Sequence, residues 1–200
     1  MMGVMSVAFD KWYKHYKIEG AHNLKCLISV NTRPMPEKLE DVKLNNEMIA
    51  LKFEFPIVAE LEPAITEAKI KFRRDMNLFT LFSISKATDL IPYLPEFMGR
   101  IIIKSFYKDV HMLYSNVPVS EEPWYICNKA TNKIGSFAHT QHDWRLFIVC
   151  STYRGELRLT CTANEKLKMD PQILIDFTND ILLEEVKKYG SINIQGSKED

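Results

Sequence analysis

The sequence predicts an α/β fold, in which strands and helices form one unit. Apolar, β-branched runs such as residues 24–31 are typical of buried strands. Other segments repeat apolar side chains at helical spacing, as in residues 171–189. The 200 residues, 46% of them hydrophobic, are enough for one domain with a substantial core. Because there is no repeat and no long linker, one domain at 1–190 is expected, followed by a flexible tail at 191–200.

The first part of the chain is predicted to form one helix and two strands. Residues 4–18 place apolar side chains three and four positions apart, and Gly20 follows as a helix stop. Residues 24–31 form the first predicted strand. A polar segment with two prolines separates it from the second predicted strand at 47–55.

The middle of the chain is predicted to be helical. A long amphipathic helix begins at Leu61, and it carries the basic cluster KFRRD at 71–75. This cluster is either a solvated helix face or a contact for phosphate or anionic lipid. Residues 78–107 keep the helical period but contain two prolines and a glycine, so two or three shorter helices are expected. The apolar stretch at 90–107 either packs in the core, rests on a membrane surface, or lines an acyl tunnel.

The last part of the chain is predicted to form strands and a final helix. HMLYS at 111–115 is a predicted strand that leads into a loop, SNVPVSEEP. The runs at 145–152 and 156–163 are separated by Tyr-Arg-Gly, which predicts a β-hairpin. Asp170 and the proline after it are the N-cap and first residue of a predicted helix.

The charge balance argues against a nucleic-acid partner, since Lys+Arg and Asp+Glu each number 26 and create no basic field. The N-terminus lacks the features of a signal peptide, and no apolar run is long enough to span a bilayer. The four cysteines show no Cys-x-x-Cys spacing and lie in apolar sequence, so they are expected to be buried and reduced. An intracellular location is expected, either cytoplasmic or peripheral to a membrane.

One short segment has the spacing of a catalytic pair. HTQHD places His139 four residues before Asp143, and a histidine so placed can deprotonate an acceptor hydroxyl. A solvated loop explains the same residues, because Trp144 stands where such sites have glycine. His142 lies beside them, but no further ligand accompanies the histidines, so no metal is expected. Phosphate-binding glycine loops and nucleophile-elbow motifs are absent from the sequence.

Four motifs occur in a specific order along the chain: SVNTRP (29–34), NN (45–46), SNVPVSEEP (115–123) and STYRGELRLTCTAN (151–164). This order resembles the C-terminal half of the wax ester synthase/diacylglycerol acyltransferase family, from about Val4 to Tyr189. The chain departs from the family pattern in several places. Val119 and Ser120 replace a Gly-Pro, Asn45 replaces a glycine, and Asn164 replaces an aspartate.

The resemblance implies a two-layer α/β sandwich with a mixed sheet and flanking helices, like the C-terminal lobe of CoA-dependent (chloramphenicol acetyltransferase-like) acyltransferases. It also implies substrate-binding roles for Arg33, Asn46, Ser115 and Asn116 beside a channel. The alternative for Ser115 and Asn116 is that they only satisfy backbone groups in a turn.

The implied function is transfer of a fatty acyl group from acyl-CoA to diacylglycerol or a long-chain alcohol. Acyl-CoA would be a co-substrate, and no other cofactor is implied. The family's His-His-x-x-x-Asp-Gly motif belongs to a catalytic N-terminal half and does not occur in this sequence. The chain is therefore expected to have no catalytic residue of its own and to need that half as a partner, with a peripheral membrane contact. Two alternatives remain: a non-catalytic lobe that binds lipid or a partner, and a divergent enzyme that uses His139 and Asp143.

Overall fold

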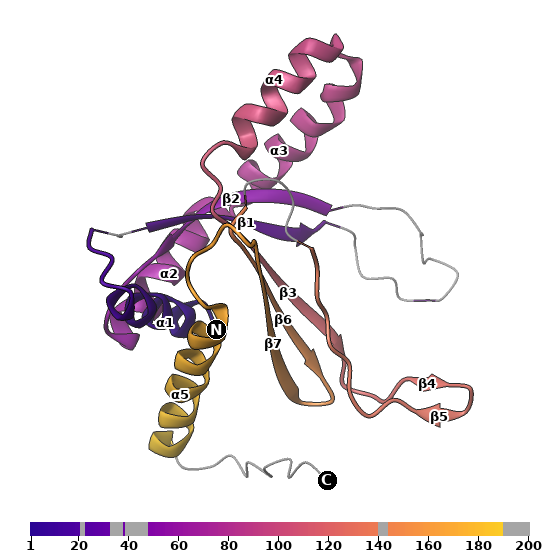
Figure 1. Ribbon diagram of the computed structural model, residues 1–200. Helices are drawn as coiled ribbons and strands as arrows, with labels where there is room; N and C mark the ends of the chain where they lie inside the picture. Colours follow the sequence, from indigo (N-terminus) through magenta and orange to yellow (C-terminus); the bar gives the residue numbers. More distant parts are fainter. Residues whose placement is uncertain (21–22, 33–37, 39–47, 140–143, 190–200) are drawn as a thin grey trace.

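The computed structural model describes the chain except residues 21–22, 33–37, 39–47, 140–143 and 190–200 (Figure 1). The elements are α1 (Met2–His15), β1 (Asn23–Asn31), β2 (Met48–Pro56), α2 (Leu61–Asp75), α3 (Leu78–Leu90), the 3-10 turn η2 (Ile91–Tyr93), α4 (Glu96–Tyr107), β3 (Met112–Ser120), β4 (Tyr125–Ile126), β5 (Lys129–Ala130), β6 (Leu146–Tyr153), β7 (Glu156–Ala163) and α5 (Pro171–Tyr189).

The main sheet of the described residues has five strands in the order β2-β1-β3-β6-β7. β1 pairs antiparallel with β2, and β6 pairs antiparallel with β7, whereas β3 runs parallel to both β1 and β6. The β6–β7 hairpin turns at Arg154 and Gly155, whose φ angles of +52° and +78° suit the twist of a two-residue turn. This mixed sheet confirms the α/β fold and the predicted hairpin.

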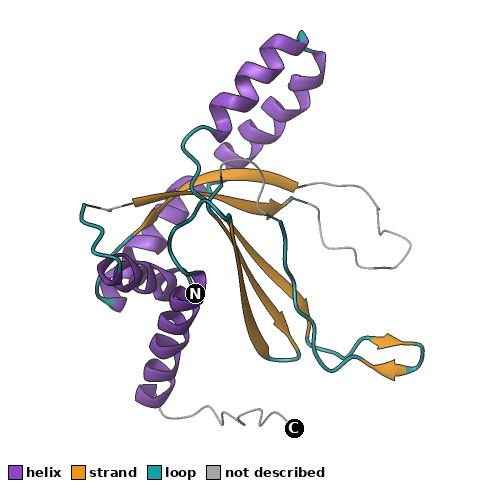
Figure 2. Ribbon diagram, in the orientation of Figure 1, coloured by secondary structure: helices purple, strands orange, loops and turns teal. Residues whose placement is uncertain are grey.

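Helices α1, α2 and α5 form the second layer against one face of the sheet (Figure 2). Strand residues that point to this face are apolar and buried, including Cys26, Met112 and Ile148. Because the helices present their own apolar stripes to these side chains, the core lies between the two layers.

Trp12 joins three parts of this core. Its side chain is 1% exposed, and its indole N–H donates a hydrogen bond of 2.9 Å to the backbone carbonyl of Asp170. The hydroxyl of Tyr16 accepts a bond from the Asp170 N–H, while the Asp170 carboxylate accepts from the N–H of Gln172. Asp170 therefore caps α5, as predicted, and α1 holds the start of that helix in place.

Helices α3 and α4 form an arm that projects from the sheet instead of covering it (Figure 1). The helices expected within 78–107 are therefore confirmed, but the arm leaves many of its apolar side chains exposed, so core packing does not account for the stretch at 90–107. No helix among the described residues has the length and apolar character to cross a membrane.

The cysteine prediction was partly wrong. All four thiols are free; Cys26 and Cys150 are buried, and Cys161 is half-buried. Burial raises the pKa of the Cys161 thiol to about 12, so it stays protonated and unreactive at neutral pH. Cys127 is instead exposed, because it occupies the tight turn between β4 and β5 with a φ of +51°. Local apolar neighbours in the sequence did not signal that turn.

Candidate functional site

Strand β3 loses one of its two neighbours halfway along its length. It pairs with β6 from Met112 to Ser120, but it pairs with β1 only from Met112 to Tyr114. Beyond that point β1 and β2 diverge from the other three strands (Figure 1). Within the described part of the chain, the segment Ser115–Ser120 therefore forms an open edge of β3 at the place where the sheet splits.

The prediction of a loop at Ser115–Ser120 was wrong, since these residues continue β3. The partner that makes them a strand is β6, which is remote in sequence and could not be inferred from the local motif. Pro118 fits because it lies on an open edge, where a missing backbone N–H is tolerated. A register shift between Pro118 and Ser120 then ends the regular pairing with β6.

Because successive residues of a strand point to opposite faces, Ser115 and Asn116 do not face the same space. Asn116 is in register with Cys150, on the face that the helices cover. Ser115 is in register with Val149, on the other face. Neither side chain has a hydrogen-bond partner among the residues that the structure describes, and Asn116 is exposed. In the described structure, these two side chains therefore do not cap backbone groups in a turn.

The face that carries Ser115 has polar residues between apolar ones such as Phe147 and Val149. In-register positions on β3, β6 and β7 contribute four hydroxyls and a guanidinium: Ser115, Ser151, Arg158, Thr160 and Thr162. We call this set the polar face. Most of the corresponding positions on the helix-covered face, such as Ile148 and Leu159, are apolar, whereas Asn116 and Thr152 are polar.

Two atoms of the polar face are buried and have no hydrogen-bond partner among the described residues. They are Oγ of Ser151, whose residue is 1% exposed, and Nε of Arg158. Ser151 and Arg158 are in register on adjacent strands, so these atoms belong to one small region beside the open edge. Buried polar groups are nearly always paired, so these two atoms call for a water, an ion or another group that completes their hydrogen bonds. The polar face is therefore a candidate binding surface.

Ser151 and Arg158 were not identified in the sequence analysis, although a signal was present. In β7 the polar residues Arg158, Thr160 and Thr162 alternate strictly with Leu and Cys. Such alternation predicts one apolar and one polar face. The pattern was used to predict the strand but not to ask what its polar face does.

Tyr153 fixes the small β4–β5 ribbon to the end of the sheet. Its hydroxyl accepts a hydrogen bond from the N–H of Trp124 (2.9 Å) and donates one to the carbonyl of Thr131 (2.8 Å). The two rings also contact edge to face, at 6.4 Å between centroids. Because Tyr153 is 2% exposed, the base of the ribbon is anchored firmly beside the end of the open edge.

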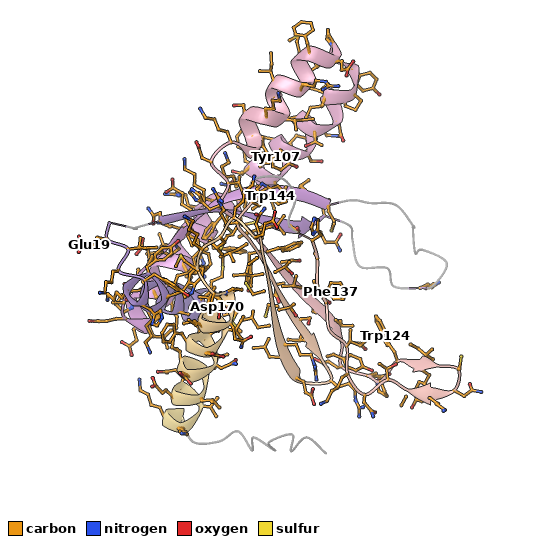
Figure 3. The ribbon with its side chains drawn as sticks, viewed as in Figure 1. Glu19, Tyr107, Trp124, Phe137, Trp144 and Asp170 are labelled. Carbon is orange, nitrogen blue, oxygen red and sulfur yellow. The ribbon has the colours of Figure 1, made fainter. Side chains whose placement is uncertain are left out.

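A hollow of about 990 Å³ lies where α4 meets the start of β3. Tyr107 and Trp144 contact each other on its wall, with ring centroids 5.6 Å apart (Figure 3). Three cations line it, namely Lys104, Lys108 and Arg145. We call this region the basic hollow.

His111, also in the lining, bridges two strands: its Nδ1 accepts a 3.1 Å hydrogen bond from the N–H of Lys25. Partial burial lowers the pKa of His111, and the charges of Lys25 and Arg145 add to this effect more than Asp109 opposes it. The neutral ring is the form that can accept the bond, so His111 supports the β1–β3 junction while unprotonated.

Acidification is expected to weaken this junction. A histidine whose pKa is lower in the folded state binds fewer protons there, so its stabilising effect is complete above about pH 6.5 and is lost as the pH falls below it. The unfolding free energy of the wild type should therefore drop more between pH 7.5 and pH 5 than that of His111→Asn, whose amide oxygen can still accept the bond. Urea denaturation at both values measures this difference. Equal drops in the two proteins would contradict the role of His111.

The remaining predicted residues divide into two groups. Arg33, Asn46 and Asp143 lie outside the described residues. His139 is described and exposed, and no partner of its side chain is found in the described part of the chain. Within that part, no three histidine, cysteine, aspartate or glutamate residues come together as a metal site.

Comparison with known proteins gives a family and two related structures. Residues 45–184 match the family described as WS/DGAT C-terminal domain. The chain is also similar in structure to the wax ester synthase/diacylglycerol acyltransferase from Marinobacter aquaeolei VT8, with a TM-score of 0.60 and 11% identity over 95% of this chain. It resembles the epimerization domain from the third module of tyrocidine synthetase B as well, with a TM-score of 0.50 and 11% identity over 93% of this chain. Comparison with curated protein sequences gives no match.

The chain covers 42% of the Marinobacter protein and 40% of the epimerization domain, so it spans about two fifths of each. At 11% identity these two likenesses show a shared fold. The family match covers 140 residues, from 45 through 184, and thus well over half of the chain.

Proposed function

Because this chain belongs to the wax ester synthase/diacylglycerol acyltransferase C-terminal domain family, we propose that it is the C-terminal domain of an O-acyltransferase. The reaction would move a fatty acyl group from acyl-CoA to diacylglycerol or a long-chain alcohol, and lead to triacylglycerol or wax ester. The family match over residues 45–184 is the observation that carries this proposal. Acyl-CoA serves as co-substrate, with no other cofactor.

In this proposal the general base is a histidine of a catalytic N-terminal half. The base takes the proton of the acceptor hydroxyl while the oxygen attacks the thioester carbonyl of acyl-CoA. An ester C–O bond forms, the C–S bond breaks, and the proton passes to the CoA sulfur. The domain works in the cytoplasm or at a membrane that synthesises lipid, which it contacts peripherally.

This chain's own residues would bind and orient the substrates beside the split in the sheet. Ser115 offers a hydroxyl from the polar face, and the Asn116 amide offers hydrogen bonds from the opposite side of the open edge. Arg33 and Asn46 remain proposed contributors by family resemblance. The buried, unpaired Oγ of Ser151 and Nε of Arg158 support the polar face as a surface that a ligand or the catalytic half completes.

Single substitutions at the open edge test this assignment. Ser115→Ala and Asn116→Ala should leave the melting temperature of the chain unchanged, because neither side chain has a partner in the described structure. In the enzyme assembled with its catalytic half, each should lower kcat/KM by about 2- to 10-fold, the value of one hydrogen bond. Acyl transfer to diacylglycerol, measured beside thermal melting, gives both quantities.

The matched control is Asn179→Ala, an exposed asparagine on α5 far from β3 in sequence and on the helical layer. It should change neither melting nor kcat/KM. Full activity of Ser115→Ala and Asn116→Ala in well-folded protein would contradict substrate contacts at the open edge. If only one variant loses activity, the face of β3 that meets the substrate is identified.

A further inference from the structure

The α3–α4 arm exposes far more apolar surface than its own two-helix packing can bury. Its exposed apolar side chains include Phe79 (80%), Phe82, Leu90, Tyr93 (85%), Phe97, Met98, Ile101, Ile102 and Ile103. An exposed apolar surface of this kind on a water-soluble domain marks an interaction site. Tyr93, at the tip between the helices, has the amphipathic ring that is favoured at a membrane–water interface.

The charges of α4 gather on one side of the helix. On α4, Glu96, Arg100 and Lys104 follow one another at four-residue spacing and so share one side of the helix. Phe97 and Ile101, at the same spacing, share a different side. Arg100 and Glu96 form an ion pair of 2.6 Å. The helix is therefore amphipathic, as interfacial helices are.

On α3 the one lysine is paired as well. Lys86 lies 3.5 Å from the carboxylate of Asp89, and its ammonium stands 5.7 Å from the centre of the Phe82 ring. A lysine that rests its carbon chain on apolar neighbours can keep its charge at the water boundary. The arm thus combines an apolar surface with charges that are either paired or able to reach water.

Among the described residues, positive charge without an ion-pair partner gathers at the base of the arm. The described lining of the basic hollow contains Lys104, Lys108 and Arg145 against one carboxylate, Asp109, which already lies 3.5 Å from Lys25. The chain as a whole has no net charge, so this excess of cations is local. Apolar side chains beside a group of lysine and arginine match the acyl chains and phosphates of an anionic lipid surface.

We propose that the α3–α4 arm docks this domain on an anionic lipid surface by lying along the interface, with its apolar side chains towards the acyl chains and its charged side chains and the basic hollow at the level of the lipid phosphates. The exposed ion pairs Lys86–Asp89 and Arg100–Glu96 flank the tip of the arm, and charges inside hydrocarbon are costly. The arm therefore suits a position along the interface and not insertion into the hydrocarbon. This inference deepens the membrane contact of the proposed function. It rests on that function because a lipid acceptor is what gives the domain a reason to be at a lipid surface.

Vesicle flotation with the full chain tests the arm. The wild type should bind vesicles of phosphatidylcholine with phosphatidylglycerol much more strongly than vesicles of phosphatidylcholine alone, and added salt should weaken the binding. Tyr93→Asp/Phe97→Asp should reduce binding by at least about tenfold, because two charges replace buried apolar contacts. Lys104→Glu/Lys108→Glu should reduce binding to anionic vesicles by about tenfold or more.

Two matched variants outside the arm serve as controls. Phe137→Asp changes an aromatic side chain that is 84% exposed, and Lys129→Glu/Lys133→Glu reverses two exposed lysines on and after the β4–β5 ribbon. Both should bind vesicles like the wild type. All substituted side chains are exposed, so circular dichroism should show an intact fold in every variant.

Three outcomes would overturn the proposal. The first is absence of vesicle binding by the wild type. The second is equal loss in the control variants. The third is a wild type that self-associates through the arm, so that Tyr93→Asp/Phe97→Asp yields monomers without changing lipid binding. Flotation uses no acyl-CoA, so its result is independent of acyl transfer. A chain that binds vesicles but never supports acyl transfer would contradict the proposed function alone.

Discussion

The purified chain, supplied with acyl-CoA and diacylglycerol, is expected to show no acyl transfer above the uncatalysed background. The sequence contains no His-His-x-x-x-Asp-Gly motif. Among the described histidines, His111 has its Nδ1 engaged with the N–H of Lys25. A missing general base typically lowers the rate by about 10²- to 10⁴-fold. Transfer of a labelled acyl chain to diacylglycerol, resolved from the substrates by chromatography, measures this directly.

Addition of a catalytic half that carries the motif should restore the activity. The coding sequence upstream of Met1 is the first place to look for that half. A matched control is the same half with its motif histidine replaced by alanine, which should restore nothing. Robust activity of the chain alone that His139→Ala abolishes would contradict the prediction and assign the base to His139. A chain that stays inactive with a competent half, yet binds lipid, would be a non-catalytic lobe.

Trp12→Ala is expected to cost about 3–5 kcal/mol of unfolding free energy, the usual range for a large aromatic side chain removed from a core. The ring is 1% exposed and contacts Phe9 and Tyr16 edge to face, with centroids 5.9 Å and 6.2 Å away. Its loss also leaves the carbonyl of Asp170 without the indole donor. Since the unfolding free energy of small domains is only about 5–15 kcal/mol, this substitution would remove much of it.

Urea denaturation of three variants separates the contributions. Trp12→Phe keeps most of the packing but removes the N–H, so it should fall between wild type and Trp12→Ala. Tyr93→Ala serves as the control, because Tyr93 is 85% exposed and its removal should change the unfolding free energy little. A loss below about 1 kcal/mol for Trp12→Ala would show that the contact between α1 and α5 is not a main support of the fold.

Features set by neighbouring residues could be predicted from the sequence. The turn at Arg154-Gly155 needs only two residues able to adopt positive φ, and Asp170 caps α5 through the N–H of Gln172, two positions away. The strand at Ser115–Ser120 could not be predicted in the same way. Its proline and polar residues are typical of a loop, and only pairing with β6 makes the segment extended.

The candidate site was likewise predicted only in part. The Ser-Asn-Val-Pro motif lies on the open edge of β3, and its substrate-binding role stays a prediction. Ser115 and Asn116 were expected beside the same channel, although they point to opposite faces of the strand. Ser151 and Arg158 become notable only when burial is known, because a buried unpaired Oγ cannot be seen in a sequence. For the arm, the sequence shows the apolar residues but not whether they are buried. Its apolar residues suit a core equally well until the fold leaves them exposed.

The split in the sheet also bears on aggregation. An open strand edge can pair with the same edge of another molecule and seed an insoluble assembly. On β3 two features oppose this: Pro118 has no backbone N–H to donate, and the register shift before Ser120 breaks the regular spacing that a second strand would need. Pro118 therefore gives the chain protection against edge-to-edge pairing while the edge stays accessible to smaller ligands.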